Sequence, residues 1–84
     1  MATVTLYTTE PCGFCTATKS LLQAYGVEYA EVNLSNDENG RAELVLSTGM
    51  MTFPQVVVDG QLVGGFNETK AALESGRLHQ LLAA

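Results

Sequence analysis

Two cysteines are the residues of this chain best suited to chemistry. Cys12 and Cys15 are the only cysteines in 84 residues, and only Gly13 and Phe14 separate them. A disulfide between them would close a loop of about four residues and remove only about 2 kcal/mol of denatured-state entropy, before ring strain is subtracted. As a structural cross-link it would stabilise little, so the spacing favours a bond that is made and broken.

The surrounding pattern predicts different roles for the two thiols. A strand-like run precedes them and a helix-like run follows, so Cys12 stands at the start of a helix. Free N–H groups and the positive end of the helix dipole favour a thiolate there, so we expect a lowered pKa for Cys12. We predict that Cys12 is the nucleophile and that Cys15, one turn later on the inner side, is the resolving thiol.

The pair has two other interpretations. Half of a zinc site is one, but a closed site needs four ligands, and the single histidine, His79, lies far along the sequence. An incidental pair of small buried thiols is the other. Placement of both cysteines at one strand-to-helix junction favours redox chemistry, and we predict no metal site within the chain.

Length and charge restrict the possible partners. A chain of 84 residues predicts a single domain, residues 1–84. Nine acidic residues against four basic ones give a net charge of −5, which disfavours nucleic acid. No basic segment leads into an apolar run near Met1, and no apolar run has the length of a membrane span, so we expect neither export nor a membrane partner. The expected location is the cytoplasm, where paired cysteines are usually catalytic, sensing or metal-bound.

The first half of the chain predicts strand, helix, strand, helix. Residues 4–8 are β-branched and aromatic, and the next helix should begin just beyond Pro11, because proline holds Glu10 extended. Cys15, Thr18, Leu22 and Tyr25 recur every three or four residues and are predicted to form its buried face. Gly26 is predicted to end the helix. Residues 28–33 alternate as a second strand, parallel to the first through a right-handed crossover. Residues 35–38 can cap a helix that runs to about Ser47 and ends at Gly49.

The second half predicts a hairpin and two helices. Residues 56–58 and 61–63 flank Asp59-Gly60, a strong signal for a two-residue hairpin turn. Asn67-Glu68 can cap a third helix, and Gly76 can end it. Leu78, Leu81 and Leu82 indicate a last short amphipathic helix. The predicted order is βαβαββα plus a short C-terminal helix.

Four features together resemble a small glutaredoxin of the thioredoxin-fold superfamily, over essentially the whole chain. They are Cys12-Gly13-Phe14-Cys15, Lys19 seven residues beyond Cys12, Thr52-Phe53-Pro54-Gln55, and Gly64-Gly65-Phe66-Asn67-Glu68. The resemblance implies an α/β thioredoxin-like fold with a four-stranded mixed sheet. It also implies a cis peptide bond before Pro54, an isomer that sequence alone would assign to only about 5–6% of prolines.

The resemblance also implies a binding site for glutathione or substrate. The backbone around Thr52, Phe53 and Pro54 would pair with a bound chain as an added strand. The stretch Gly65, Phe66, Asn67 and Glu68 would offer close backbone approach and helix N–H groups to a carboxylate. Its alternative is a plain hairpin and helix cap. Lys19 and Arg41 are further candidates, and each is equally compatible with a solvated surface position.

The sequence departs from the usual family pattern in its active-site motif and in two expected cations. Many dithiol members resemble C-P-Y-C, whereas Gly13-Phe14 is similar to the C-G-F-S motif of the monothiol, iron–sulfur-handling branch. The lysine usual before the active cysteine is absent, since Thr8, Thr9 and Glu10 stand there. Met50-Met51 stand where members often place a basic residue. The absence of this lysine and the presence of Met50-Met51 each remove a cation that would hold a glutathione carboxylate.

The implied activity is that of a glutathione-dependent thiol–disulfide oxidoreductase, a monomer that reduces protein disulfides and glutathionyl mixed disulfides with glutathione as reducing cosubstrate. Two alternatives stay open. In one, two chains share a [2Fe-2S] cluster through Cys12 and two glutathiones. In the other, the chain donates electrons to ribonucleotide reductase and is itself reduced by thioredoxin reductase.

Overall fold

The computed structural model describes residues 3–83. Its elements follow the predicted order, including the short C-terminal helix: β1 (Val4–Thr8), α1 (Gly13–Ala24), β2 (Ala30–Asn33), α2 (Glu38–Thr48), β3 (Gln55–Val58), β4 (Gln61–Gly64), α3 (Phe66–Ser75) and α4 (Arg77–Ala83). The second strand is shorter than the predicted 28–33. Within the described residues, no helix combines the length and the apolar character that crossing a membrane requires.

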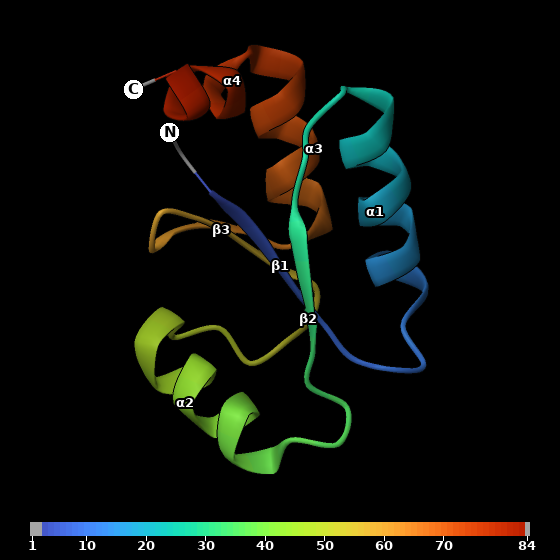
Figure 1. Ribbon diagram of the computed structural model, residues 1–84, viewed down its shortest axis with the longest axis vertical. Coiled ribbons are helices and arrows are strands. Elements are labelled where there is room, and N and C mark those ends of the chain that lie inside the picture. Colours follow the sequence, from blue (N-terminus) through green and yellow to red (C-terminus); the bar gives the residue numbers. More distant parts are fainter. Residues whose placement is uncertain (1–2, 84) are drawn as a thin grey trace.

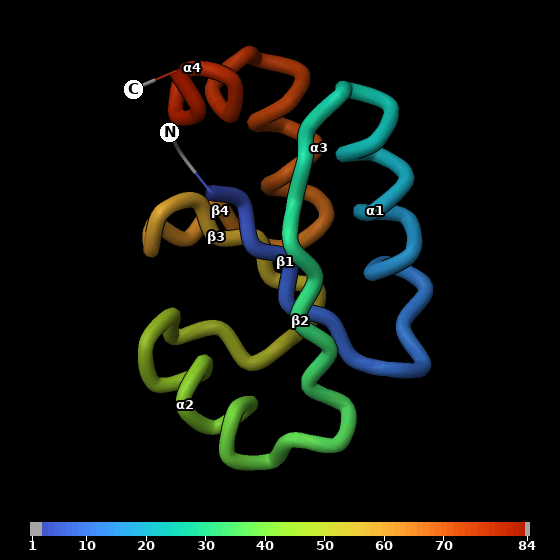
Figure 2. Tube along the Cα trace, viewed as in Figure 1, coloured from blue at the N-terminus to red at the C-terminus, as the bar shows by residue number. Residues whose placement is uncertain are grey.

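The four strands form one mixed sheet in the order β2-β1-β3-β4. β1 and β2 are parallel, as the right-handed crossover predicts, while β1–β3 and β3–β4 are antiparallel. Figure 1 shows α1 and α3 together on one side of the sheet and α2 on the other, and the trace in Figure 2 shows the same arrangement. The α/β thioredoxin-like fold is therefore confirmed.

The register of β1 with β3 brings two distant loops together. Tyr7 lies opposite Gln55, so the C-terminal end of β1 and the N-terminal end of β3 lie side by side. The chain leaves β1 towards Cys12 at this end of the strands, and it enters β3 at the same end, directly after Pro54. Antiparallel pairing thus places the cysteine pair beside a loop about forty residues further along the chain.

The core lies between the sheet and the α1–α3 layer. Val4, Leu6 and Thr8 alternate inward along β1, as the two-residue period of a strand requires. Leu6, Leu22 and Leu78 are completely buried, and burial of each leucine stabilises the fold by about 2 kcal/mol. Cys15, Thr18 and Leu22 form the buried stripe of α1, as predicted. Tyr25 was predicted on that stripe and is 40% exposed, because α1 ends at Ala24 and Tyr25 is its C-cap.

Helix and hairpin ends follow the local signals, with one exception. Asp59 and Gly60 have positive φ angles of 48° and 82°, as a two-residue hairpin turn requires. Asp37 caps α2 by accepting a hydrogen bond from the backbone N–H of Gly40. The exception is the start of α3, where the predicted cap at Asn67 is wrong: the N-cap is Gly65. Glu68 decides this start, because its carboxylate accepts the Gly65 N–H at 2.8 Å.

Candidate active site

The cysteine pair occupies the N-terminus of α1. Cys12 is the N-cap in an extended conformation, and its sulfur accepts a hydrogen bond from the Cys15 backbone N–H at 3.1 Å. A disulfide joins the two residues, whose Cα atoms lie 5.3 Å apart. Cys12 is half-buried, whereas Cys15 is only 2% exposed. An attacking molecule therefore reaches Cys12 more easily, and the helix N–H is directed at the Cys12 sulfur.

The loop before β3 faces the pair. Its Phe53-Pro54 peptide bond is cis, as the family resemblance implied, and the Glu10-Pro11 bond is cis as well, which no sequence signal indicated. The Cys12 sulfur lies 3.9 Å from the carbonyl oxygen of Phe53. The backbone of Phe53 is therefore positioned beside the Cys12 sulfur.

The side chain of Gln55 holds the loop before β3 in place by hydrogen bonds. Its side chain is fully buried, and its amide nitrogen donates to the carbonyls of Met50 at 2.7 Å and Thr52 at 3.1 Å. Its amide oxygen accepts from the Thr48 hydroxyl at 2.9 Å. A buried amide is stable only when its groups are paired, so these bonds connect the loop to the end of α2.

A mostly apolar groove of about 340 Å³ lies on one side of the cysteine pair. Its lining contains every residue that the resemblance assigned to the loop and to α3: Thr52, Phe53, Pro54, Gly65, Phe66, Asn67 and Glu68, together with Phe14 and Met50. The rings of Phe14 and Phe66 lie 5.6 Å apart, which connects the start of α1 to the start of α3. Three segments distant in sequence thus make one surface.

The start of α3 is open to an acidic group. Gly65 carries no side chain that could accept a first-turn N–H, and no side-chain cap bond is formed there. The N–H groups of this turn therefore receive no acceptor from the cap residue, and the residues that carry them line the groove. Gly64 has a φ of 135°, and a Cβ on it would lie 2.6 Å from the Cβ of Glu68, so close approach at this corner requires glycine.

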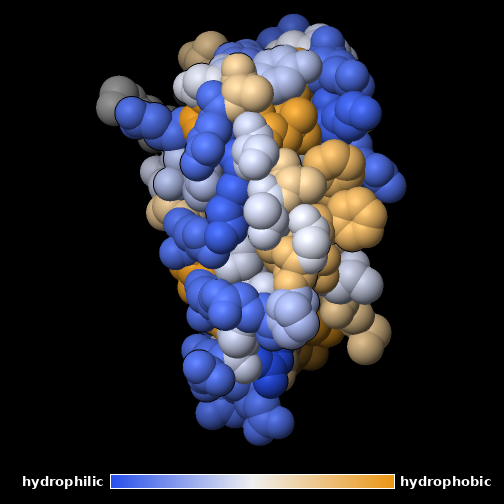
Figure 3. All heavy atoms as spheres, turned by 90° about the vertical axis from the view of Figure 1, so that its right-hand side faces the viewer, coloured by the Kyte–Doolittle hydropathy of each residue, from blue (hydrophilic) through white to orange (hydrophobic). Residues whose placement is uncertain are grey.

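A polar cleft of about 540 Å³ lies on the other side of the pair. It is lined by Thr8, Thr9, Glu10, Pro11, Cys12, Cys15, Thr16, Lys19, Glu31 and Asn33. Seen from the α1 side, hydrophilic residues gather along one edge of the molecule and hydrophobic residues along the other (Figure 3). The lining of the cleft is likewise mostly polar and that of the groove mostly apolar, so two surfaces of opposite character lie near the cysteine pair.

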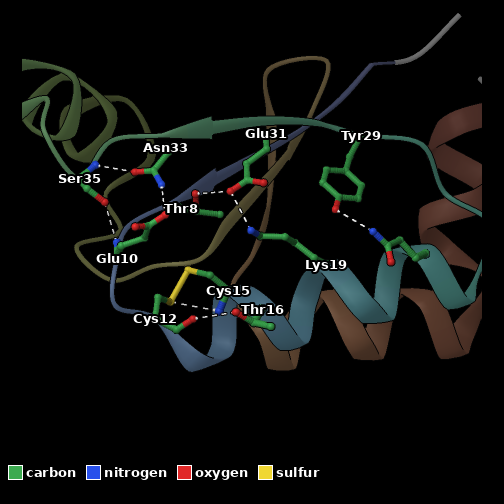
Figure 4. A network of polar contacts seen from close by, with 11 residues as sticks. Thr8, Glu10, Cys12, Cys15, Thr16, Lys19, Tyr29, Glu31, Asn33 and Ser35 are labelled. Carbon is green, nitrogen blue, oxygen red and sulfur yellow. Dashed lines mark hydrogen bonds and ion pairs between the residues drawn. A yellow bond between two sulfur atoms is a disulfide. The ribbon is translucent and has the colours of Figure 1, made fainter.

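An ion pair forms the wall of this cleft. The Lys19 ammonium on α1 lies 3.0 Å from the Glu31 carboxylate on β2, and the Thr8 hydroxyl donates to the same carboxylate oxygen at 2.9 Å. Figure 4 shows Lys19 reaching from α1 towards Glu31 above the cysteine pair. The hydrogen bond from Lys19, followed by that from Thr8, lowers the pKa of Glu31 below its ordinary value of 4.5 despite partial desolvation.

The loops around the cleft are tied to each other. The Glu10 carboxylate accepts from the Asn33 amide at 2.9 Å, and the Glu10 backbone N–H donates to the Ser35 hydroxyl at 2.7 Å (Figure 4). Arg41 donates to the carbonyls of Leu34 and Ser35 from α2. These bonds fix the segment before Cys12 against the segment after β2.

Neither of the two cationic candidates is among the residues that line the groove. Lys19 lies in the polar cleft and is paired with Glu31, and Arg41 is engaged with two loop carbonyls. His79 lies at the other end of α1, with its ring 6.5 Å from that of Tyr25, so it is far from the cysteines. Sequence reasoning did not name Phe14 or Met50 as groove residues. The signals present were the placement of Phe14 between the cysteines and the position of Met50, where family members often have a basic residue.

Comparison with known proteins agrees with this geometry. Residues 4–63 match the glutaredoxin family model. Glutaredoxin 3 of Escherichia coli K12 is 35% identical over 82 residues, which cover 98% of this chain and 99% of that protein. A glutaredoxin of Pseudomonas aeruginosa is 37% identical over 84 residues, the full length of both chains.

The chain belongs to the glutaredoxin family. A crystal structure of a buckwheat glutaredoxin–glutathione complex superimposes on it with a TM-score of 0.85 at 26% identity, covering 98% of this chain and 77% of that one. This glutaredoxin is a thiol–disulfide oxidoreductase with a redox-active cysteine pair, and the predicted family, fold class and general activity are confirmed.

Proposed function

We propose that this glutaredoxin reduces glutathionyl mixed disulfides and protein disulfides, with glutathione as the reducing cosubstrate. The observation that carries the proposal is the asymmetry of the pair. Cys12 is half-buried, its sulfur accepts a helix N–H and lies 3.9 Å from the carbonyl of Phe53 in the groove lining, whereas Cys15 is 2% exposed. A thiolate at a helix N-terminus is the expected nucleophile, so Cys12 attacks and Cys15 resolves.

Two exchange routes follow from that assignment. With a glutathionyl substrate, Cys12 forms a bond to the glutathione sulfur and the substrate thiolate leaves. A second glutathione thiolate then attacks that sulfur, releasing oxidised glutathione and the Cys12 thiolate. With a protein disulfide, Cys12 attacks one sulfur, the substrate S–S bond breaks and the first substrate thiolate leaves. Cys15 then attacks the Cys12 sulfur, which releases the second substrate thiolate and forms the Cys12–Cys15 disulfide. Two glutathiones afterwards return the pair to the dithiol form and leave as oxidised glutathione.

A low pKa at Cys12 acts mainly on the second step of the first route. Lowering a thiol pKa from about 8.5 to about 5 raises the thiolate fraction at neutral pH about thirtyfold, but a Brønsted slope of about 0.4–0.5 reduces nucleophilicity by a similar factor. Attack by Cys12 is therefore nearly unchanged. The gain is in its departure as a leaving group, which accelerates turnover of the glutathionylated enzyme.

Glutathione would occupy the apolar groove. The Phe53 backbone, 3.9 Å from the Cys12 sulfur, is placed to pair with the bound tripeptide between Thr52 and Pro54. The first-turn N–H groups around Phe66, Asn67 and Glu68 would receive a ligand carboxylate, with Gly65 allowing close approach. The structural similarity to a glutaredoxin–glutathione complex supports this placement. Lys19 and Arg41 are not assigned to glutathione, because both cations already have protein partners.

The decisive experiment compares two cysteine variants on two substrates. Cys12→Ser is expected to abolish turnover of both. Cys15→Ser should keep reduction of a small glutathionyl mixed disulfide, measured with glutathione and its reductase, and lose reduction of a protein disulfide. Labelling of Cys15 before Cys12 by iodoacetamide in the reduced protein would contradict the assignment.

A second candidate function is favoured by the lining of the groove. Among the described residues that line it, Glu68 is charged, and none is a lysine or an arginine. A groove without cations suits a dedicated protein electron donor, such as one for ribonucleotide reductase that thioredoxin reductase recycles. The same assays with thioredoxin reductase in place of glutathione decide between the two, because the proposed function requires turnover with glutathione.

The iron–sulfur alternative requires more than this chain supplies. Within residues 3–83, no group of three or more metal-ligating side chains is assembled. A [2Fe-2S] cluster would therefore need Cys12 of two chains together with two glutathiones. Anaerobic reconstitution followed by visible absorption tests it. The proposal assigns the protein to the cytoplasm as a monomer, and fractionation and sedimentation would check these two points.

A further inference from the structure

The polar cleft contains charges that the proposed exchange reactions do not yet use. Lys19–Glu31 is the only ion pair within residues 3–83, and it lies in the wall of a cleft that both cysteines line. Lys19 follows Cys15 by four residues on α1, so the two side chains occupy neighbouring positions on one face of the helix. The pair lies opposite the groove that would hold glutathione, which indicates a role other than binding that ligand.

A negative charge on the sulfur of Cys15 is less well stabilised by its surroundings than one on the sulfur of Cys12. Every dithiol step places negative charge on the Cys15 sulfur, either as the thiolate that attacks Cys12 or as the thiolate that leaves when the disulfide is reduced. Cys15 is 2% exposed, so water solvates this charge poorly. The nearby backbone N–H, that of Cys15 itself, is directed at Cys12. Cys15 therefore needs a charge partner other than the helix terminus.

Lys19 is the cation placed to meet this need. Of the residues that line the cleft, Glu10, Lys19 and Glu31 carry charges, and Lys19 is the only cation among them. The Glu10 carboxylate is held by Asn33, and the Glu31 carboxylate is held by Lys19 and Thr8. Thr8 is buried in β1, so the Glu31 carboxylate has a fixed anchor in the sheet. Glu31 and Thr8 together keep the Lys19 ammonium at this end of the cleft.

We propose that Lys19, positioned by Glu31 and Thr8, stabilises the negative charge that the Cys15 sulfur carries whenever the Cys12–Cys15 bond is made or broken. This inference rests on the proposed resolving role of Cys15. It assigns the two sides of the pair to the two thiols: the groove and the helix N-terminus serve Cys12, and the ion pair in the cleft serves Cys15.

A coloured aromatic disulfide separates the two steps without glutathione. Reduced protein is mixed in a stopped-flow instrument with one equivalent of a symmetrical nitrobenzoate disulfide. Cys12 forms a bond to one aryl sulfur, the aryl S–S bond breaks, and the first yellow thiolate is released. Cys15 then gives its proton to solvent and attacks the Cys12 sulfur, which releases the second thiolate and leaves the Cys12–Cys15 disulfide. Absorbance of the thiolate reports both phases.

The central variant is Lys19→Gln. Loss of a cation that shifts a thiol pKa by one unit lowers the thiolate fraction about tenfold, and the more basic thiolate regains about threefold in nucleophilicity, so the second phase should slow about threefold. The first phase should stay unchanged. Lys19→Arg should restore most of the second-phase rate. Lys70→Gln, which makes the same change at an exposed lysine on α3, should alter neither phase.

Glu31→Gln distinguishes electrostatics from structure. Glutamine keeps an acceptor for Lys19 and Thr8 and removes the opposing negative charge, so the second phase should be as fast as in the unmodified protein or faster. A slowing equal to that of Lys19→Gln would mean that the intact ion pair matters only structurally, and would overturn the inference. An unchanged second phase in Lys19→Gln would overturn it too. The absence of a second phase in the unmodified protein would instead contradict the resolving role of Cys15.

Discussion

The groove and the cleft on the two sides of the cysteine pair are built by different physical means. The groove is lined by apolar side chains such as Phe14, Phe53 and Phe66, and among the described residues its lining contains no cation. The cleft is lined by threonines and by the charged residues Glu10, Lys19 and Glu31. The start of α3 beside the groove has no side-chain cap, whereas the charged side chains of the cleft already have partners within the protein.

This difference suggests a division of labour in a small oxidoreductase. Backbone groups at a helix start and beside a proline can bind a peptide-like molecule without side-chain specificity, which suits exchange with many disulfides. Fixed charges suit a reaction step that occurs inside the protein, because they need no reorganisation when charge develops. The two supporting residues match this division: Gln55 holds the groove loop and Arg41 holds the cleft loop, each by donating to two carbonyls.

The largest stability effect is expected at the buried support of the groove. Gln55→Leu leaves the carbonyls of Met50 and Thr52 and the hydroxyl of Thr48 without their partner, which should cost about 3 kcal/mol of unfolding free energy. Urea denaturation measures it. Gln61→Leu makes the same change at an exposed position and should be nearly neutral. Equal stabilities of the two variants would show that Gln55 does not hold the loop.

The next effect is at the corner of the groove. Gly64→Ala forces a side chain onto a φ of 135° and against the Cβ of Glu68, and should lower the unfolding free energy by about 2 kcal/mol. Gly60→Ala also has a positive φ, but its Cβ would meet nothing within 4 Å. The difference between the two variants therefore measures the close approach at the groove. If Gly60→Ala is the more destabilised protein, the tight corner is not what requires glycine at position 64.

A smaller effect is expected at the support of the cleft. Arg41→Ala removes the donor to the Leu34 and Ser35 carbonyls, which are partly solvated, so it should lower the unfolding free energy by about 1 kcal/mol. The KM for glutathione should not change, because Arg41 is outside the groove lining. Arg77→Ala, an exposed position on α4, is the control. A raised KM for glutathione with unchanged stability would show that Arg41 takes part in glutathione binding.

The smallest effect is the pH dependence of the cleft. The pKa of Glu31 is lowered in the folded protein, so its contribution is complete above the ordinary value of 4.5 and is lost as pH falls through the folded value. The pair is partly exposed, so the contribution should stay under about 1 kcal/mol. Unfolding curves at neutral and acidic pH should show that the advantage over Glu31→Gln disappears in acid. An advantage that persists in acid would contradict the sign of the shift.

Local sequence signals were sufficient for most of the fold. Period-two and period-3.6 patterns located β1 and α1, Asp59-Gly60 located the hairpin, and Gly76 located the end of α3. Each of these signals involves residues within a few positions of each other, so the chain's own geometry determines them. The start of α3 was mispredicted because Asn67 and Glu68 are both capable of capping, and only the path of the chain through Gly64 and Gly65 selects Glu68.

The features of the site also divide into those that the sequence predicted and those that required the tertiary structure. The residue types and spacing of Cys12 and Cys15 were enough to indicate dithiol chemistry, because a helix start has a fixed local chemistry. The expectation of a peptide-binding surface at Pro54 and Gly64-Gly65 came from the resemblance to glutaredoxins. The pairing of Lys19 with Glu31, the contact of Phe14 with Phe66 and the hold of Gln55 on its loop required the packed structure. Such contacts depend on how helices and strands lie against one another, and that arrangement is determined by the core as a whole rather than by any local spacing.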